Sequence, residues 1–297
     1  MLSKSNLSKN QLCKYFAHCS YGPIEALNGI LMFLSVSSIW IGITGFFMAY
    51  MSYTLIGLRP NIAICFIVFL VVFSVYSLNK FTDMKEDEIN MPERTKFISR
   101  RKRLVLFSAL SAYVLSIVIT LLVKPSAILI VIVPLVTNAI YGSKLIPGIP
   151  RFKDIPVMKN VFVALTWALV VLFSAVGTVC LQDILIAIIF YFILVKYFIN
   201  TVLFDIRDVK GDRERGVKTM PVILGTRITF VVLLAINSTL LFLVPFAPDA
   251  VKVLMAAMVL YGYAIIIHFR KRRNPLQLDL LVDGEWVLAT IFYIIFI

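Results

Sequence analysis

The chain has 297 residues, of which 60% are hydrophobic and only 15% are charged, and its mean hydropathy is +0.93. A water-soluble domain carries about a quarter charged residues, so this composition excludes an ordinary soluble globular protein. The net charge of +13 would suit a nucleic-acid-binding protein, but the basic residues alternate between loops in a way that such binding does not explain.

Apolar segments separated by Pro-containing and charged loops predict an all-α, polytopic membrane protein with about nine transmembrane helices surrounding a central cavity. We expect these helices at Ile24–Leu55, Ile62–Leu78, Leu104–Val123, Ala127–Tyr141, Val161–Cys180, Ile184–Phe204, Ile228–Phe246, Val251–Phe269 and Trp286–Ile297. The first exceeds the roughly 20 residues that a bilayer needs, so it should be tilted, kinked near Asn28 and Gly29, or extended into water. The last is short and is expected to begin at Trp286 or as early as Leu278.

No repeat or linker indicates a second domain, so we expect one integral-membrane domain over residues 1–297, with residues 1–20 as a basic tail. The tail and every second loop carry all but four of the 29 Lys and Arg. The exceptions are Arg59, Lys124 and Lys252 in the opposite loops, and Lys196 inside an apolar segment. The positive-inside rule then predicts that the N-terminus and the basic loops lie on the cytoplasmic side.

Two acidic segments lie on that side, each at the end of an apolar segment. Their polar residues are Asn79, Asp83 and Asp87 in the first, and Asp205, Asp208 and Asp212 in the second. Each set falls on one face if its segment is helical, and like charges so placed repel unless a cation neutralises them. An oxygen-only donor set without His or Cys favours Mg²⁺ over zinc, and the nearby Lys and Arg suit a phosphate-bearing ligand. One such segment alone is more often a solvated loop, whereas two on the same side favour a metal site.

The two segments resemble the motifs of the UbiA superfamily of intramembrane prenyltransferases. The family's first motif, N-D-x-x-D-x-x-x-D, is similar to residues 79–87, with Lys80 in place of the usual Asp, and the I-N-x-P-x-R continuation is similar to Ile89–Arg94. The second motif, D-x-x-D-x-x-x-D followed by G-x-x-T-x-P-V-x-x-G, is similar to residues 205–225. A Tyr-containing element resembles Tyr141–Leu145, and a basic pair that opens the fifth helix resembles Lys159 and Asn160. The resemblance extends over nearly the whole chain.

The resemblance implies an enzyme that transfers a polyprenyl group from a prenyl diphosphate to an aromatic or lipid acceptor within the membrane and releases pyrophosphate. It implies one Mg²⁺ at Asn79, Asp83 and Asp87, and a second at Asp208 and Asp212 with Asp205 beside them. Candidate diphosphate ligands are Arg94, Lys144, Lys153 and Lys159, and the candidate catalytic residues are Asp83, Asp208 and Tyr141. Tyr141 would steady the diphosphate or the allylic carbocation. Lys196, about 13 Å before Asp205 along a helix, is expected to face the same cavity.

Three other classes of membrane protein remain as alternatives. A secondary transporter would also be polytopic, but transporters place ion-coupling charges mid-membrane in broken helices, whereas nearly all the acids here lie in loops or near expected interfaces. A structural subunit would not require two matching acidic motifs, and a lipid-phosphate phosphotransferase would show a tighter single motif. The acceptor stays open among a quinone precursor, a glycerol-phosphate lipid, a porphyrin-type ring and a protohaem, as does the length of the donor chain.

Overall fold

The computed structural model describes residues 23–82, 84–142, 155, 157–175, 184–214, 216–271 and 274–296. This part of the chain is almost entirely helical and contains no strand, as the long apolar segments predicted. The α-helices are α2 (Pro23–Val36), α3 (Ile39–Leu55), α4 (Ile62–Thr82), α5 (Met84–Asn90), α6 (Pro92–Arg100), α7 (Lys102–Val123), α8 (Ile128–Gly142), α9 (Met158–Ala175), α10 (Ile184–Glu214), α11 (Met220–Leu224), α12 (Thr226–Thr239), α13 (Asp249–Lys271), α14 (Pro275–Leu278) and α15 (Glu285–Phe296). Within the described residues, 3₁₀ turns occur at Pro125–Ala127, Leu240–Phe242 and Val244–Phe246, and a π-helix, η5, spans Asp279–Asp283.

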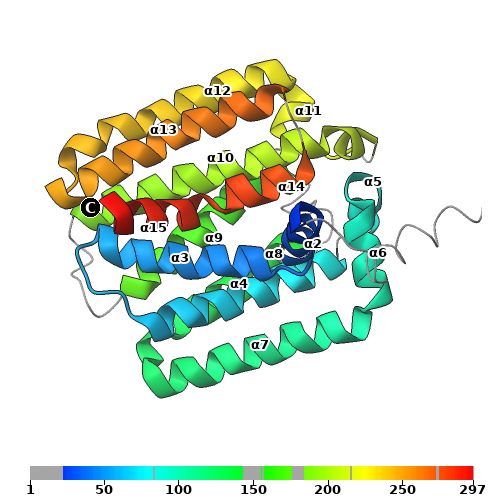
Figure 1. Cartoon of the computed structure of the whole chain (residues 1–297), viewed down its shortest axis with the longest axis horizontal. Coiled ribbons are helices and arrows are strands. Elements are labelled where there is room, and N and C mark those ends of the chain that lie inside the picture. Colours follow the sequence, from blue (N-terminus) through cyan, green and yellow to red (C-terminus); the bar gives the residue numbers. More distant parts are fainter. Residues whose placement is uncertain are drawn as a thin grey trace, which may run out of the picture.

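The long helices run side by side along the long axis of the molecule (Figure 1). Helix α4 packs against α3 and α7, α10 packs on α9, and α12 pairs with α13 along one edge. The short helices α5, α6, α11 and α14 gather with α2 at one end of the bundle. Both acidic segments therefore belong to the same end, because α4 and α10 each finish there.

Among the residues that the structure describes, five helical stretches are long and apolar enough to cross a membrane, or six if α2 and α3 count as one bent span. The stretches at α8, α9 and α15 are apolar but shorter. The all-α membrane architecture is thus confirmed, while the count of nine spanning helices is not confirmed by length and composition.

Helix α7 has one face that packs against the bundle and one that is exposed. Its small residues Ala109, Ala112, Ser116 and Thr120 are buried, and the Ser74 hydroxyl of α4 donates to the Ala109 carbonyl at 2.7 Å. The opposite face of α7 exposes large apolar side chains, including Phe107, which is 72% exposed. A face of this kind on an outer helix fits contact with acyl chains rather than with water.

The bend in the first apolar segment occurs later than the sequence predicted. Helix α2 passes through Asn28 and Gly29 without a break, and the axis turns by 74° at Ser37 and Ser38, where Ser38 has φ 67°. The Ser37 hydroxyl donates to the Leu34 carbonyl at 3.3 Å and so competes with continuation of the helix. Of the three alternatives predicted for this segment the structure shows a kink, but at the polar Ser37–Ser38 pair rather than near Asn28 and Gly29.

Lys80 secures this bend from the neighbouring helix. Its ammonium donates to the carbonyls of Ser35 and Val36 at 2.9 and 3.0 Å. The last carbonyls of a helix have no partner within that helix, and a cation beside them also interacts favourably with the negative end of the helix dipole. Lys80, which departs from the family motif, therefore caps the C-terminal end of α2.

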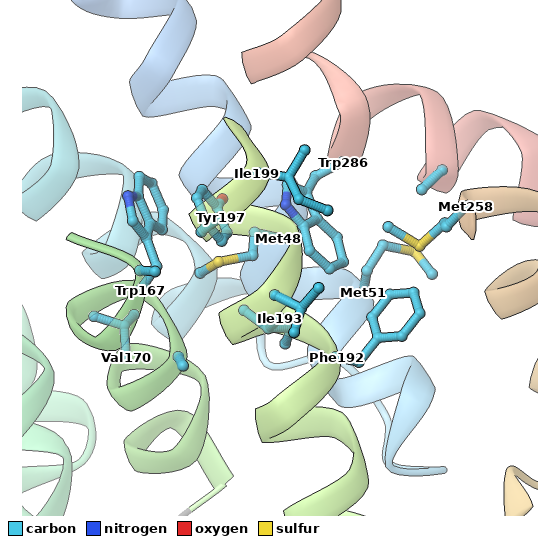
Figure 2. Close-up of a cluster of buried hydrophobic side chains, with 14 of the residues drawn as sticks. Met48, Met51, Trp167, Val170, Phe192, Ile193, Tyr197, Ile199, Met258 and Trp286 are labelled. Carbon is cyan, nitrogen blue, oxygen red and sulfur yellow. The ribbon is translucent and has the colours of Figure 1, made fainter. Parts of the chain in front are cut away.

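Aromatic rings join three helices in the middle of the bundle (Figure 2). Trp167 of α9 stacks on Tyr197 of α10, with centroids 4.3 Å apart and planes 7° apart, and Tyr197 lies near-parallel to Trp286 of α15 at 6.2 Å. Met48 and Met51 of α3 pack in the same buried cluster. Methionine fills irregular gaps between rigid rings, so Met48 and Met51 complete the packing of this layer.

Candidate functional site

A cavity of about 300 Å³ lies among α4, α9, α10 and the π-helix. Its charged lining residues, together with Asn79, are Lys80, Asp87, Arg94, Lys159, Asp205, Arg207, Asp208, Asp279 and Asp283. Its apolar lining includes Val71 and Val75 of α4 and Trp167 and Val170 of α9. At 1.5 Å per residue, Val71 lies about 12 Å deeper than Asn79 along α4. The cavity is therefore polar where the helices end and apolar toward the middle of the bundle.

The second acidic segment is held on the last turns of α10. Asp205 is almost fully buried and accepts hydrogen bonds from Lys159 at 2.9 Å and from the Asn160 side-chain amide at 2.7 Å. A buried carboxylate needs such partners, because an unpaired charge away from water is strongly unfavourable. The basic pair that opens α9 and the second acidic segment therefore meet at the cavity.

Asp208 lies one turn further on and forms a bidentate contact with its own neighbour. The Arg207 guanidinium donates through Nε and Nη2 to the two oxygens of Asp208, both at 2.8 Å. Its Nη1 donates to Asp279 at 3.2 Å. Arg207 therefore connects the end of α10 to the π-helix and holds two carboxylates at the cavity.

The first acidic segment reaches the cavity from α4, α5 and α6. Asn79 and Asp87 both line it, and Arg94 donates to Asp87 at 3.3 Å. Helix α5 packs against α10, where Gly211 accommodates Asn90: a Cβ at Gly211 would lie 2.3 Å from the Asn90 side-chain oxygen. The two motifs of the sequence thus touch each other directly, through a glycine in one and an asparagine next to the other.

Replacing Gly211 with Ala is expected to lower the free energy of unfolding by about 1–3 kcal/mol, because the added methyl overpacks this contact. The measurement is the thermal unfolding midpoint in detergent. Adding Asn90→Ala should restore much of the loss by removing the clashing atoms. Gly29→Ala is the control, since no atom lies within 4 Å of the position of its Cβ. Equal effects of Gly211→Ala and Gly29→Ala would contradict the steric explanation.

Two further acidic residues, outside both acidic segments, lie at the polar end of the cavity, and the sequence did not lead us to predict them. Asp279 accepts hydrogen bonds from the Ser35 hydroxyl and from Arg207, and Asp283 lines the cavity one turn later. The signal was present in the sequence as two acids four residues apart before the last apolar segment, on the side of the other acids. It was missed because the family motifs do not include it.

Lys196 was expected to face the cavity that holds the acidic segments, and this expectation was wrong. It is fully buried and does not line the cavity formed by the described residues; instead it forms an ion pair with Glu285 and donates to the Met258 carbonyl at 3.1 Å. Gly262 makes room for it, because a Cβ there would lie 3.0 Å from the Lys196 ammonium nitrogen. The partner was overlooked because Glu285 precedes the last expected span by one residue.

Six predicted site residues surround the same cavity: Asn79, Asp87, Arg94, Lys159, Asp205 and Asp208. Asp212 is not part of its described lining. Asp83, Lys144 and Lys153 lie outside the described residues, as does the side chain of Tyr141. The ligand roles of all these residues stay predictions.

The donor set can be tested against Mg²⁺ chemistry. Within the described ranges, no three carboxylate, imidazole or thiol groups converge closely enough to hold a metal ion by themselves. Mg²⁺ is usually held by one or two carboxylates and completes its shell with water and substrate phosphates. The carboxylate and amide oxygens at this cavity, among whose lining residues there is no His or Cys, fit that mode.

Residues 36–279 match the UbiA prenyltransferase family. The chain is 26% identical over 256 residues to the digeranylgeranylglyceryl phosphate synthase of Thermococcus kodakarensis, covering 80% of this chain and 87% of that protein. It is 30% identical over 199 residues to the corresponding synthase of Pyrococcus abyssi, covering 63% of this chain and 64% of that one.

Solved structures share the fold. A UbiA homolog from Archaeoglobus fulgidus bound to GPP and Mg²⁺ aligns with a TM-score of 0.65 at 15% identity, covering 88% of this chain and 96% of that chain. A structure of digeranylgeranylglyceryl phosphate synthase aligns with a TM-score of 0.54 at 17% identity, covering 88% and 94%. The helical arrangement is thus one that membrane proteins of this type adopt.

Proposed function

Because the chain belongs to the UbiA prenyltransferase family, we propose that it transfers a geranylgeranyl group from its diphosphate to a hydroxyl group of a glyceryl phosphate lipid. The chain is an integral membrane prenyltransferase; the proposal concerns its two substrates. The relatives are named for a product that carries two geranylgeranyl groups on glyceryl phosphate, which such a transfer would complete.

One observation carries the proposal: a single cavity joins residues of both acidic segments to an apolar, aromatic interior. The diphosphate of the donor would bind at the polar end, and the isoprenoid chain would extend along Val71, Val75, Trp167 and Val170. An allylic carbocation survives only where water is excluded. The aromatic rings beside the acidic residues exclude water and present the negative faces of their π-systems to the cation.

The charges at the polar end favour a diphosphate accompanied by metal ions. The described lining contains five carboxylates and four Lys or Arg side chains, so its formal charge is slightly negative and would repel a bare diphosphate. Mg²⁺ would supply the charge that lets the diphosphate leave. We assign Asn79, Asp83 and Asp87 to one ion, and Asp208 and Asp212, with Asp205, to a second.

Basic residues would hold the outer oxygens of the diphosphate. Arg94 and Lys159 line the cavity and already face carboxylates there, so they can turn toward the substrate when metal ions neutralise Asp87 and Asp205. We further assign Tyr141 and Lys144 to this role on the resemblance of Tyr141–Leu145 to the family pattern, and Lys153 as a basic residue of the segment that follows. The N-terminus and both acidic segments would face the cytoplasm, as the distribution of Lys and Arg indicates.

The test is product formation by the purified protein in lipid nanodiscs. Geranylgeranyl diphosphate and geranylgeranylglyceryl phosphate should give digeranylgeranylglyceryl phosphate, detected by mass spectrometry, and chelation of Mg²⁺ with EDTA should abolish the product. Thermal stabilisation by the donor and Mg²⁺ alone separates donor binding from acceptor choice, since a ligand at a hundredfold excess over its Kd stabilises by about 2.7 kcal/mol. Donor stabilisation without product would reject this acceptor, while neither signal would reject both substrates.

A secondary transporter is not favoured. Family membership and the cavity at the helix ends both fit group transfer. The buried mid-bundle charges Lys196 and Glu285 neutralise each other rather than lining a path for an ion.

A further inference from the structure

Five carboxylates line the cavity, and four of them are already engaged by cations. Asp87 faces Arg94, Asp205 faces Lys159, and Asp208 and Asp279 share Arg207. Asp283 differs, because its carboxylate accepts no hydrogen bond and forms no ion pair with the side chains that the structure describes. Its electrostatic neighbours are Asp279, Arg207, Lys80 and Arg94, none of which is bonded to it, and Tyr197 of α10 also lies within electrostatic range.

Asp283 lies at the junction between the polar and the apolar parts of the cavity. Asn200 donates to the carbonyl of the preceding residue, Val282, at 3.2 Å, so Asp283 is level with that turn of α10. Asn200 precedes Asp205 by five residues, which is about 7.5 Å deeper along the helix. The reacting carbon of a prenyl diphosphate is bonded directly to the diphosphate, so it must lie just inside the acidic end, at this same depth.

The backbone that carries Asp283 is held unusually firmly. Four carbonyls of the π-helix accept hydrogen bonds from side chains of other helices: Asp279 from Trp40 at 3.1 Å, Leu281 from Tyr261 at 2.8 Å, Val282 from Asn200 at 3.2 Å, and Asp283 from Thr44 at 2.8 Å. A π-helix is rare and is frequently found at functional sites. Hydrogen-bond donors from α3, α10 and α13 thus hold in place the backbone segment from which the Asp283 side chain projects.

From this geometry we propose that Asp283 is the general base that accepts the proton of the acceptor hydroxyl. This role rests on the proposed transfer to a glyceryl hydroxyl. The C1–O bond of the donor breaks with its electron pair remaining on the diphosphate, and the acceptor oxygen forms the new bond to C1. The hydroxyl proton passes to a carboxylate oxygen of Asp283 and leaves through the polar end of the cavity. Asp83 and the other predicted metal ligands are unsuited to this step, because a carboxylate bound to a metal ion is a poor base.

The test uses two acceptors that differ in their need for a base. Geranylgeranylglyceryl phosphate has a hydroxyl that must lose its proton, whereas a thiol at that position is far more acidic than a hydroxyl and supplies thiolate at about pH 9 without a base from the protein. Asp283→Asn should lower transfer to the hydroxyl by about 10²- to 10⁴-fold, which is the usual contribution of a general base. Transfer to the thiolate should stay within about threefold of the unchanged protein, and Mg²⁺-dependent stabilisation by geranylgeranyl diphosphate should be retained.

Two further variants complete the design. Asp283→Glu keeps a carboxylate and should recover part of the hydroxyl transfer, and Asp249→Asn removes an exposed carboxylate outside the cavity and should change neither reaction. Equal losses with both acceptors, loss of donor stabilisation, or hydroxyl transfer within fivefold of the unchanged protein would each overturn the role of Asp283. If the unchanged protein binds the donor but does not use the hydroxyl acceptor, the proposed acceptor fails, and the assignment of Asp283 falls with it.

Discussion

Replacing Asp208 with Asn is expected to lower kcat/KM for prenyl transfer by about 10²- to 10³-fold, equivalent to about 2.7–4 kcal/mol of transition-state stabilisation. Asn has nearly the same shape as Asp but lacks the negative charge that would hold Mg²⁺ beside the diphosphate. The measurement is the initial rate of product formation across a range of Mg²⁺ concentrations. Excess Mg²⁺ should restore only part of the rate, because the charge of the site has changed.

The fold should tolerate this substitution. Arg207 keeps its hydrogen bond to Asp279 at 3.2 Å, and the amide oxygen of the introduced asparagine can still accept from the guanidinium. The thermal midpoint without ligand should therefore match that of the unchanged protein, and stabilisation by geranylgeranyl diphosphate with Mg²⁺ should be lost. Asp249→Asn, at a side chain that is 95% exposed, serves as the matched control. Turnover within tenfold of the unchanged protein would remove Asp208 from the site.

Replacing Lys196 with Met is expected to lower the free energy of unfolding by about 3–5 kcal/mol. Lys196 and Glu285 are both almost fully buried and paired with each other, so removal of the cation leaves an uncompensated carboxylate inside the bundle. Asn200, whose side chain also donates to Glu285 at 3.5 Å, cannot replace the lost charge. Unfolding in detergent or by SDS titration measures the loss.

A second substitution distinguishes a broken ion pair from lost packing. Lys196→Met combined with Glu285→Leu should recover most of the stability, because apolar residues of similar size can replace a buried pair at little cost. Lys252→Met is the matched control: Lys252 pairs with exposed Asp249, and its removal should leave the unfolding midpoint unchanged. If the double variant is no more stable than the single one, the pairing with Glu285 is not the source of the effect.

The buried pair also bears on the proposed base. Glu285 follows Asp283 by two residues, and its pairing with Lys196 fastens the start of α15 to α10. Asn200 contacts both Glu285 and the π-helix carbonyl of Val282. We therefore expect variants of Lys196 that still fold to bind the donor normally but to transfer the prenyl group more slowly.

The class of the protein and the positions of its helices could be read from the amino-acid sequence. Long apolar runs have no stable alternative to helices in a bilayer, because every backbone polar group must be paired within its own segment. The clustering of Asn79, Asp87, Asp205 and Asp208 also followed from the sequence, since each acidic segment ends a helix on the same side. The residue types within each segment, and the alternation of basic and non-basic loops along the chain, were sufficient for these conclusions.

Other features depended on contacts between residues that are far apart in the chain. The partner of Lys196 is 89 positions away, and the carboxylates of Asp279 and Asp283 join the cavity because the π-helix η5 packs beside α3. The bend at Ser38 is stabilised by Lys80 from another helix, which no local pattern indicates. The sequence by itself determined an all-helical membrane protein with two acidic motifs at one end. Only the tertiary structure decided which charges neutralise each other and which carboxylate stays uncommitted, because that depends on how side chains of separate helices meet in a medium with little water to solvate them.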